Sequence, residues 1–291
     1  IKELAEKYRN ESLINNASRA NKNEDQTVSF ILSESFSDPS RVPGVTLSEN
    51  VIPNITQIKD EYTSGLMISD FYGGGTANME IQALTGLSYS NLSPSVSVMN
   101  TEVFPKMSYI PSISDSYTDD EKITVHLHNG ANYSRNIVYK DLGFDTFIAL
   151  DGTDDKPTQL EYLSAGARDS STYYAVTSNL SSDTSQFFSV ITMQNHIPWE
   201  AEEPAEITAY GEGLSDEENE SLTSYARLLN ITDSATADFL NELSGYDKKI
   251  TVVFYGDHLP GLYPASIFSS NPLNQYETDY YIWTNYETQK L

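Results

Sequence analysis

Short apolar runs recur along the chain, and each run has the length of one strand. They are rich in β-branched and aromatic residues and lie at 28–32, 123–128, 144–148, 187–192, 250–255 and 280–283. Near-continuous apolar runs of this length are typical of strands that are buried on both faces of a sheet. We therefore expect these runs to form a central sheet.

Stretches with helical spacing of apolar residues lie between these runs. We expect helices at 77–87, 132–141, 158–168 and 216–243. The last begins with Ser215 followed by Glu218, which predicts a capping box. Strands that alternate with helices predict an α/β domain whose central sheet is mainly parallel and flanked by helices. We expect residues 1–27 to be a polar, partly helical lead-in and residues 28–291 to form the domain.

Composition narrows the classes of function. The chain has 42 acidic and 17 basic residues and a net charge of −25, which argues against binding to nucleic acid or to an anionic membrane surface. It has no cysteine, which excludes disulfides and thiolate nucleophiles. No apolar run approaches the roughly 18 residues of a membrane span. Because the first residue is Ile1, we expect a fragment whose membrane segment would lie upstream.

A glycine-rich turn precedes one of the expected helices. Three consecutive glycines at 73–75 lead into Thr76 and the apolar pattern of 77–84. Helix N-termini favour anions, so the Thr76 hydroxyl is a candidate nucleophile for phosphate chemistry. Threonine is also a common N-cap residue, and this interpretation stays open at this point.

Ionisable residues follow several of the expected strands directly. Glu34 follows the run at 28–32, and His128 ends the run at 123–128. His196 follows the run at 187–192, and Asp257 with His258 follows the run at 250–255. Each could be an ordinary solvated, capping or packed side chain. Their shared position at strand ends argues for a common site, because the carboxyl ends of parallel strands meet at one edge of the sheet.

The residue types at these strand ends favour one divalent cation. Glutamate, aspartate and histidine are ligands for hard and borderline metal ions. A threonine oxygen could complete such a set, and metal coordination activates a weak hydroxyl nucleophile. The sequence therefore predicts a site formed by Glu34, Thr76, Asp257 and His258 around one metal ion.

Four separated motifs resemble a known family in their order along the chain. They read ILSESF at 31–36, GGTANMEIQALTG at 74–86, MQNHIPW at 193–199 and YGDHLP at 255–260. Together they resemble the extracellular domain of lipoteichoic acid synthase-type phosphoglycerol transferases, from the sulfatase branch of the alkaline phosphatase superfamily. The resemblance covers about residues 28–285. It implies a sulfatase-like fold and, because family domains usually continue further, a C-terminal subdomain beyond residue 291.

The resemblance also implies residue roles. The family's single metal ion, typically manganese with magnesium as the alternative, would be bound by Glu34, Thr76, Asp257 and His258. Thr76 would be the catalytic nucleophile. His196 would bind substrate, and we expect it either to protonate the leaving alkoxide or to hold the phosphate. Arg135 would contact phosphate with His128 nearby; since lipoteichoic acid synthases proper have aspartate at the position of His128, we expect a related enzyme that decorates a polysaccharide.

The implied reaction transfers glycerol phosphate from phosphatidylglycerol, through a covalent threonine intermediate, to a glycerophosphate chain or a polysaccharide. The implied location is the extracellular face of the cell membrane of a Gram-positive bacterium, reached through an upstream membrane segment. Two alternatives stay open. One is a phosphodiesterase or phosphatase of the same superfamily that uses water as acceptor, and the other is a non-catalytic surface binding module.

Overall fold

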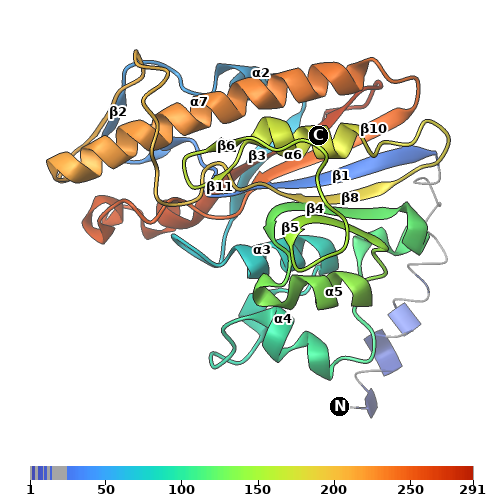
Figure 1. The fold of residues 1–291 in the computed structure, drawn as a ribbon. Coiled ribbons are helices and arrows are strands. Elements are labelled where there is room, and N and C mark those ends of the chain that lie inside the picture. Colours follow the sequence, from blue (N-terminus) through green and yellow to red (C-terminus); the bar gives the residue numbers. More distant parts are fainter. Residues whose placement is uncertain (1, 4–5, 9, 12–13, 15–24, 291) are drawn as a thin grey trace.

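A seven-stranded sheet runs through the centre of the computed structural model, which describes residues 2–3, 6–8, 10–11, 14 and 25–290 (Figure 1). The strand order is β3-β11-β10-β1-β8-β4-β5. In sequence order the strands are β1 (Gln26–Ser33), β3 (Thr63–Ile68), β4 (Lys122–Asn129), β5 (Thr146–Asp151), β8 (Phe187–Ile191), β10 (Lys249–Gly256) and β11 (Glu277–Thr284). The six expected strands are therefore present, with shifted ends.

The sheet is mainly parallel, as the sequence predicted. The neighbours β10, β1, β8, β4 and β5 all run parallel, and β11 is antiparallel to both β10 and β3. The carboxyl ends of β1, β8, β4 and β10 consequently meet at one edge. All of the strand-end candidates lie at this edge.

Helices cover both faces of the sheet (Figure 1). One face carries α2 (Pro53–Glu61), α6 (Asp169–Thr177) and α7 (Asp216–Ser244), and the other carries α3 (Thr76–Thr85), α4 (Met99–Glu102) and α5 (Arg135–Asp141). Neighbouring strand residues point into different core clusters: Ile31, Val190 and Phe254 into the first, and Leu32, Ile191 and Tyr255 into the second. Burial on both faces explains why these strands are continuously apolar.

The capping box predicted for the long helix is confirmed. Ser215 Oγ accepts a hydrogen bond from the Glu218 amide at 3.3 Å, and Glu218 Oε2 accepts one from the Ser215 amide at 2.7 Å. These two bonds satisfy amides that an α-helix leaves without partners at its start. The helix therefore begins one residue after Ser215.

The prediction of a helix at 158–168 is wrong. The chain there forms a small hairpin of β6 (Tyr162–Leu163) and β7 (Gly166–Ala167), with Ser164 in the turn at φ 56°. Gly166 packs its backbone so closely against Met193 that an added Cβ would lie 2.0 Å from the Met193 carbonyl oxygen. This close approach requires glycine and an extended chain, and it overrides the helical spacing of the leucines.

Several elements lie outside the strands and helices that the sequence predicted. The segment 36–58 contains β2 (Val45–Leu47), which pairs with β9 (Ala209–Gly211), and the start of α2. The segment 88–118 is built from short helical turns: α4, η2 (Tyr89–Asn91), η3 (Phe104–Lys106) and η4 (Ile113–Ser116). Other 3-10 turns are η1 (Pro39–Arg41), η5 (Asp119–Glu121), η6 (Asn132–Ser134), η7 (Ala265–Phe268) and η8 (Pro272–Tyr276).

The lead-in predicted for residues 1–27 falls only partly within the described residues. Those described before residue 25 are helical, and β1 begins at Gln26. Among the described residues, none of the helices combines the length and the hydrophobicity that a membrane span requires.

Candidate active site and metal centre

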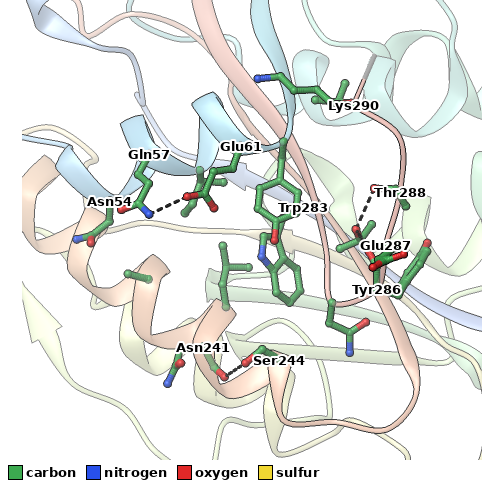
Figure 2. Close-up of a pocket in the computed structure, with 17 residues that line it drawn as sticks. Asn54, Gln57, Glu61, Asn241, Ser244, Trp283, Tyr286, Glu287, Thr288 and Lys290 are labelled. Atoms are coloured by element: carbon green, nitrogen blue, oxygen red, sulfur yellow. Dashed lines mark hydrogen bonds between the residues drawn. The ribbon is translucent and has the colours of Figure 1, made fainter.

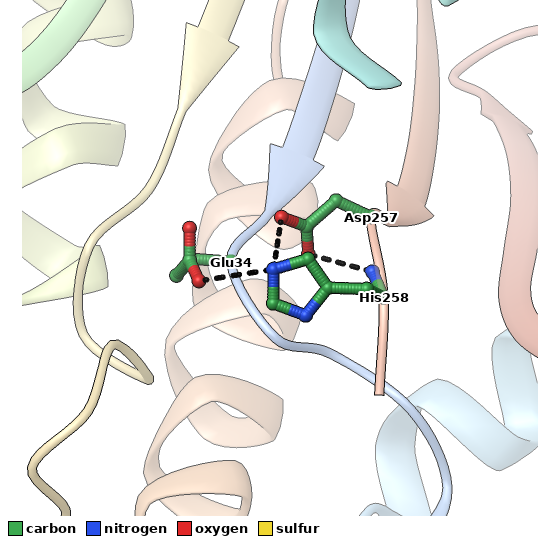
Figure 3. Close-up of side chains that lie close together, drawn as sticks. All are labelled: Glu34, Asp257 and His258. Carbon is green, nitrogen blue, oxygen red and sulfur yellow. Dashed lines mark hydrogen bonds and ion pairs between the residues drawn. The ribbon is translucent and has the colours of Figure 1, made fainter. Parts of the chain in front are cut away.

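Two neighbouring parallel strands bring three of the candidate residues together. Ser33 at the end of β1 pairs with Gly256 at the end of β10. The residues that follow, Glu34 on one strand and Asp257 with His258 on the other, therefore emerge side by side. All three side chains are buried, and one ligand atom from each lies within 4.8 Å of the others (Figure 3).

The glycine-rich turn brings the fourth residue to the same place. The Gly73 amide donates a hydrogen bond to the Leu259 carbonyl oxygen at 3.0 Å, which ties the turn to the loop after β10. Gly75 then adopts φ 96°, where an added Cβ would lie 2.3 Å from Phe71 Cγ. The helix α3 begins at the next residue, Thr76, at the edge of the site.

The Thr76 hydroxyl interacts with the site and does not cap its helix. Its Oγ1 donates a hydrogen bond to Glu34 Oε2 at 3.0 Å and lies 3.3 Å from His258 Nε2. Gly75 occupies the N-cap position without a side-chain bond. The N-cap interpretation of Thr76 is therefore wrong, because its oxygen faces the acidic residues rather than the amides of its own helix.

The histidine ring lies between the two carboxylates (Figure 3). His258 Nε2 is 3.2 Å from Asp257 Oδ2 and 3.7 Å from Glu34 Oε1, while Nδ1 lies 2.9 Å from the Leu259 carbonyl oxygen. A carbonyl only accepts, so Nδ1 carries the proton of the neutral ring and Nε2 presents its lone pair to the site. A backbone partner of this kind orients many metal-binding histidines.

The electrostatics of the site favour an additional positive charge. Burial and then the charge of Glu34 raise the pKa of Asp257. Burial alone would lower the pKa of His258, but the charges of Asp257 and Glu34 outweigh it and raise that pKa. Both shifts reflect buried negative charge that lacks a full counter-charge.

These donors fit one divalent cation. Asp257 Oδ2 is buried, lies 3.2 Å from His258 Nε2 and accepts no hydrogen bond from the described residues, whereas Asp257 Oδ1 accepts bonds from the Ser35 and His258 amides at 2.8 and 2.9 Å. One oxygen is thus fixed by the backbone and the other is left facing the site. Two carboxylates, one imidazole nitrogen and a hydroxyl form a set that manganese or magnesium accepts.

A second group of candidates lies beside this centre. Arg135 is buried at the start of α5, and His128 and His196 are half-buried at the ends of β4 and β8. Burial, and after it the charges of His196 and Arg135, lower the pKa of His128. Burial alone would lower the pKa of Arg135, but the charge of Glu80 and, to a smaller extent, that of Glu34 outweigh it and raise that pKa. His128 near the end of β4 and His196 after β8 therefore lie at the same edge of the sheet as Glu34.

Two buried residues behind the site had not been singled out from the sequence. Glu80 lies one helical turn after Thr76 and pairs with Arg135, with 2.8 Å between Glu80 Oε2 and Arg135 Nε. Asp169 accepts a hydrogen bond from Thr232 Oγ1 at 2.6 Å, and Thr232 in turn contacts Asn195 beside His196. The four-residue spacing from Thr76 was the available signal for Glu80, whereas Asp169 carried none.

A separate cavity of about 770 Å³ lies between α2, α7 and the end of β11 (Figure 2). Trp283 lies among its lining residues, with Gln57 and Glu61 from α2 and Asn241 and Ser244 from α7 around it (Figure 2). None of the candidate site residues lines it. It is therefore distinct from the candidate active site.

Comparison with known proteins identifies the family. The model of the sulfatase family matches residues 26–290. The chain belongs to the sulfatase family. Among curated proteins, it is 30% identical over 250 residues to a candidate cyclic beta-1,2-glucan modification protein of Rhizobium meliloti, with 84% of this chain and 37% of that protein covered. The chain therefore spans well under half of this relative's length.

Solved structures of the same fold include a phosphoglycerol transferase and a lipoteichoic acid synthase. The Streptococcus pyogenes phosphoglycerol transferase GacH, in complex with sn-glycerol-1-phosphate, is 50% identical with a TM-score of 0.94, and the match covers 100% of this chain and 76% of GacH. The lipoteichoic acid synthase LtaP from Listeria monocytogenes is 19% identical with a TM-score of 0.64, covering 89% of this chain and 65% of LtaP. The resemblance seen in the sequence motifs is confirmed for family and fold.

Proposed function

We propose that this chain is the catalytic domain of a phosphoglycerol transferase that moves glycerol phosphate from phosphatidylglycerol to a cell-envelope polymer. The single observation that carries the proposal is the convergence of Thr76 with Glu34, Asp257 and His258 at the end of the sheet. The 50% identity to GacH, which binds sn-glycerol-1-phosphate, supports the choice of the transferred group.

Four residues would hold one divalent cation, most readily manganese, with magnesium as the alternative. These are Glu34, Thr76, Asp257 and His258. When bound, such an ion would neutralise the buried carboxylates and favour the ionised form of a nearby hydroxyl. Asp257 Oδ2, buried without a donor among the described residues, supports this assignment.

In the first half-reaction, Thr76 Oγ1 attacks the phosphorus of phosphatidylglycerol. A bond forms between Oγ1 and phosphorus while the bond from phosphorus to the diacylglycerol oxygen breaks. Glu34 Oε2 accepts the hydrogen bond of the Thr76 hydroxyl at 3.0 Å and is a base within reach of its proton. Arg135 and the amides at the start of α3 stabilise negative charge on the phosphoryl oxygens.

The leaving diacylglycerol oxygen requires a proton donor, and the attacking hydroxyl of the acceptor molecule requires a base. His196 is half-buried in the loop after β8, and a histidine near neutral pH can give a proton to the leaving diacylglycerol oxygen. In the second half-reaction an acceptor hydroxyl attacks the same phosphorus and gives its proton to His196, while the bond from phosphorus to Thr76 Oγ1 breaks and Oγ1 takes back the proton that Glu34 had accepted. The glycerol phosphate then remains on the acceptor.

The acceptor class that we favour is a polysaccharide. The curated relatives of this chain are a candidate glucan modification protein and the capsular polysaccharide biosynthesis protein RkpI of Rhizobium meliloti, the second 27% identical over 158 residues. His128, where lipoteichoic acid synthases proper have aspartate, agrees with this choice. We place the reaction at the extracellular face of a Gram-positive cell membrane, with a membrane segment outside residues 1–291 and the catalytic domain at 28–291.

Incubation with fluorescent phosphatidylglycerol and manganese tests the proposal. The wild-type chain should release diacylglycerol, and Thr76→Ala should not. Addition of a cell-envelope polysaccharide should then move glycerol phosphate onto the polymer. Release of free glycerol phosphate in place of transfer would favour the hydrolase alternative, and no diacylglycerol release by the wild type would favour a binding module.

A further inference from the structure

A buried ion pair connects the helix of the nucleophile with the arginine beside it. Glu80 lies on α3 one turn after Thr76, so the two side chains share a face of the helix. Glu80 Oε2 accepts a hydrogen bond from Arg135 Nε at 2.8 Å, and the exposed fractions of the two side chains are 1% and 4%.

This ion pair is not an effective way to stabilise the fold. Desolvation of two charges costs about as much as their attraction returns unless every polar atom is satisfied. Glu80 Oε1 is buried and has no hydrogen-bond partner within 3.5 Å among the described residues, although burial and then the nearby charge of Glu80 raise the pKa of Tyr139. A buried carboxylate with one unsatisfied oxygen is costly, which argues that Glu80 has a role other than holding the fold together.

The arginine is held from a second direction as well. The two residues before it, Tyr133 and Ser134, adopt positive φ angles of 55° and 56°, and the Tyr133 ring centre lies 5.2 Å from Arg135 Cζ. Arginine offers five donors in a fixed planar fork. Among the described residues Arg135 donates only the Nε bond to Glu80, so both Nη groups remain as donors for a phosphoryl group.

We propose that Glu80 is a positioning residue that fixes the Arg135 fork relative to Thr76, so that one helix sets both the nucleophile and the anion-binding group. The inference rests on the proposed function, because it takes Arg135 as the phosphate ligand. It predicts that the charge of Glu80 acts on the substrate only through Arg135.

Calorimetric titration with sn-glycerol-1-phosphate in the presence of manganese tests this role. Glu80→Gln keeps the size of the side chain and removes its charge. We expect it to weaken binding about ten- to hundredfold, the range typical when a group that orients a ligand is lost. The double variant Glu80→Gln with Arg135→Gln should bind no more weakly than Arg135→Gln alone, because the two residues act as one unit.

The matched control is Asp233→Asn, which removes another fully buried carboxylate, on α7 at the opposite face of the sheet. It should alter the melting temperature without altering glycerol phosphate affinity. Wild-type affinity in Glu80→Gln, or additive losses in the double variant, would overturn the inference and leave the proposed function intact. Absence of binding by the wild type would overturn both. Should Glu80→Gln not fold, Glu80→Asp, which shortens the pair, must show the same coupled loss.

Discussion

The hydroxyl of Thr76 lies between a carboxylate and an imidazole, 3.0 Å from Glu34 Oε2 and 3.3 Å from His258 Nε2. Neither partner belongs to its own helix. A threonine whose oxygen is drawn away from the free amides of its helix gives no capping stabilisation. Its position therefore makes sense as part of the site.

Removal of this hydroxyl should abolish turnover without unfolding the chain. Thr76→Ala deletes one oxygen from a half-buried position at a helix start. We expect diacylglycerol release to fall about a thousandfold or more, the scale seen when a nucleophile is removed. Circular dichroism and the melting temperature should stay close to those of the wild type. Substantial release by Thr76→Ala would contradict the assignment of the nucleophile.

Loss of one carboxylate should lower the metal content. Asp257→Asn keeps the size of the side chain but replaces an anionic oxygen that faces the site with a neutral amide. Elemental analysis after dialysis against manganese should give about one ion per wild-type chain and much less for the variant. Asp233→Asn, with its buried carboxylate on α7, is the control and should retain the metal.

The buried acid Asp169 should make stability depend on pH. Burial raises its pKa from 3.8 to about 6. A carboxyl whose pKa is raised by folding stabilises the native state below its unfolded value, and this contribution is lost as pH rises through about 6. Relative to the wild type, Asp169→Asn should therefore gain about 2 kcal/mol between pH 4 and pH 7. Urea unfolding at both pH values measures this difference, and an unchanged difference would contradict the shift.

The candidate metal ligands could be predicted from the sequence because they follow strands directly. Glu34 and Asp257 come at the ends of two apolar runs. The parallel pairing of β1 with β10 brings these two ends side by side. Glu80 and Asp169 gave no comparable signal. Their importance depends on which residues fold against them, Arg135 in one case and Thr232 in the other, and such partners 55 and 63 positions away are set only by tertiary structure.

At the scale of elements, the turn before α3 decides where Thr76 lies. Gly75 combines φ 96° with close contact to Phe71. Gly75→Ala should cost about 1–2 kcal/mol from the backbone alone and should displace Thr76 from Glu34. We expect a lower melting temperature and a much lower rate of diacylglycerol release.

The control for this variant is Gly245→Ala at the end of α7, where φ is −82° and an added Cβ meets only the Glu242 carbonyl oxygen at 3.4 Å. This change should leave both the rate and the stability nearly unchanged. Equal behaviour of the two variants would show that the turn does not position the nucleophile.

The elements that the sequence predicted well are those with a local signal. Buried strands have continuous apolar runs, and α7 has both amphipathic spacing and a capping box. The hairpin at 162–167 was mistaken for a helix because its cause is the packing of Gly166 against Met193. The helix α6 was missed because it buries polar residues such as Thr172 along with its apolar ones, which erases the amphipathic pattern.

At the scale of the whole molecule, the sheet holds the site between two separate cores. One core packs under α2, α6 and α7, and the other packs under α3, α4 and α5. The residues proposed to bind metal directly follow β1 and β10 or begin α3, and they therefore join the sheet to one helical layer. Metal binding should consequently stabilise the whole domain rather than one loop.

Manganese should raise the melting temperature. Ligand at about one hundred times its dissociation constant adds about 2.7 kcal/mol to the stability of the native state, which corresponds to roughly 5 °C for a chain of this size. Thermal unfolding with manganese, and then with a chelator, measures the effect. Asp257→Asn should show no such rise, and an equal rise in both proteins would place the ion elsewhere.

Mass spectrometry of the acid-quenched protein tests the central claim most directly. The wild-type chain is incubated with phosphatidylglycerol and manganese, quenched during turnover and digested. The account predicts a glycerophosphoryl group on the peptide that contains Thr76. A group found on another residue, or diacylglycerol release with no modification of that peptide, would contradict it.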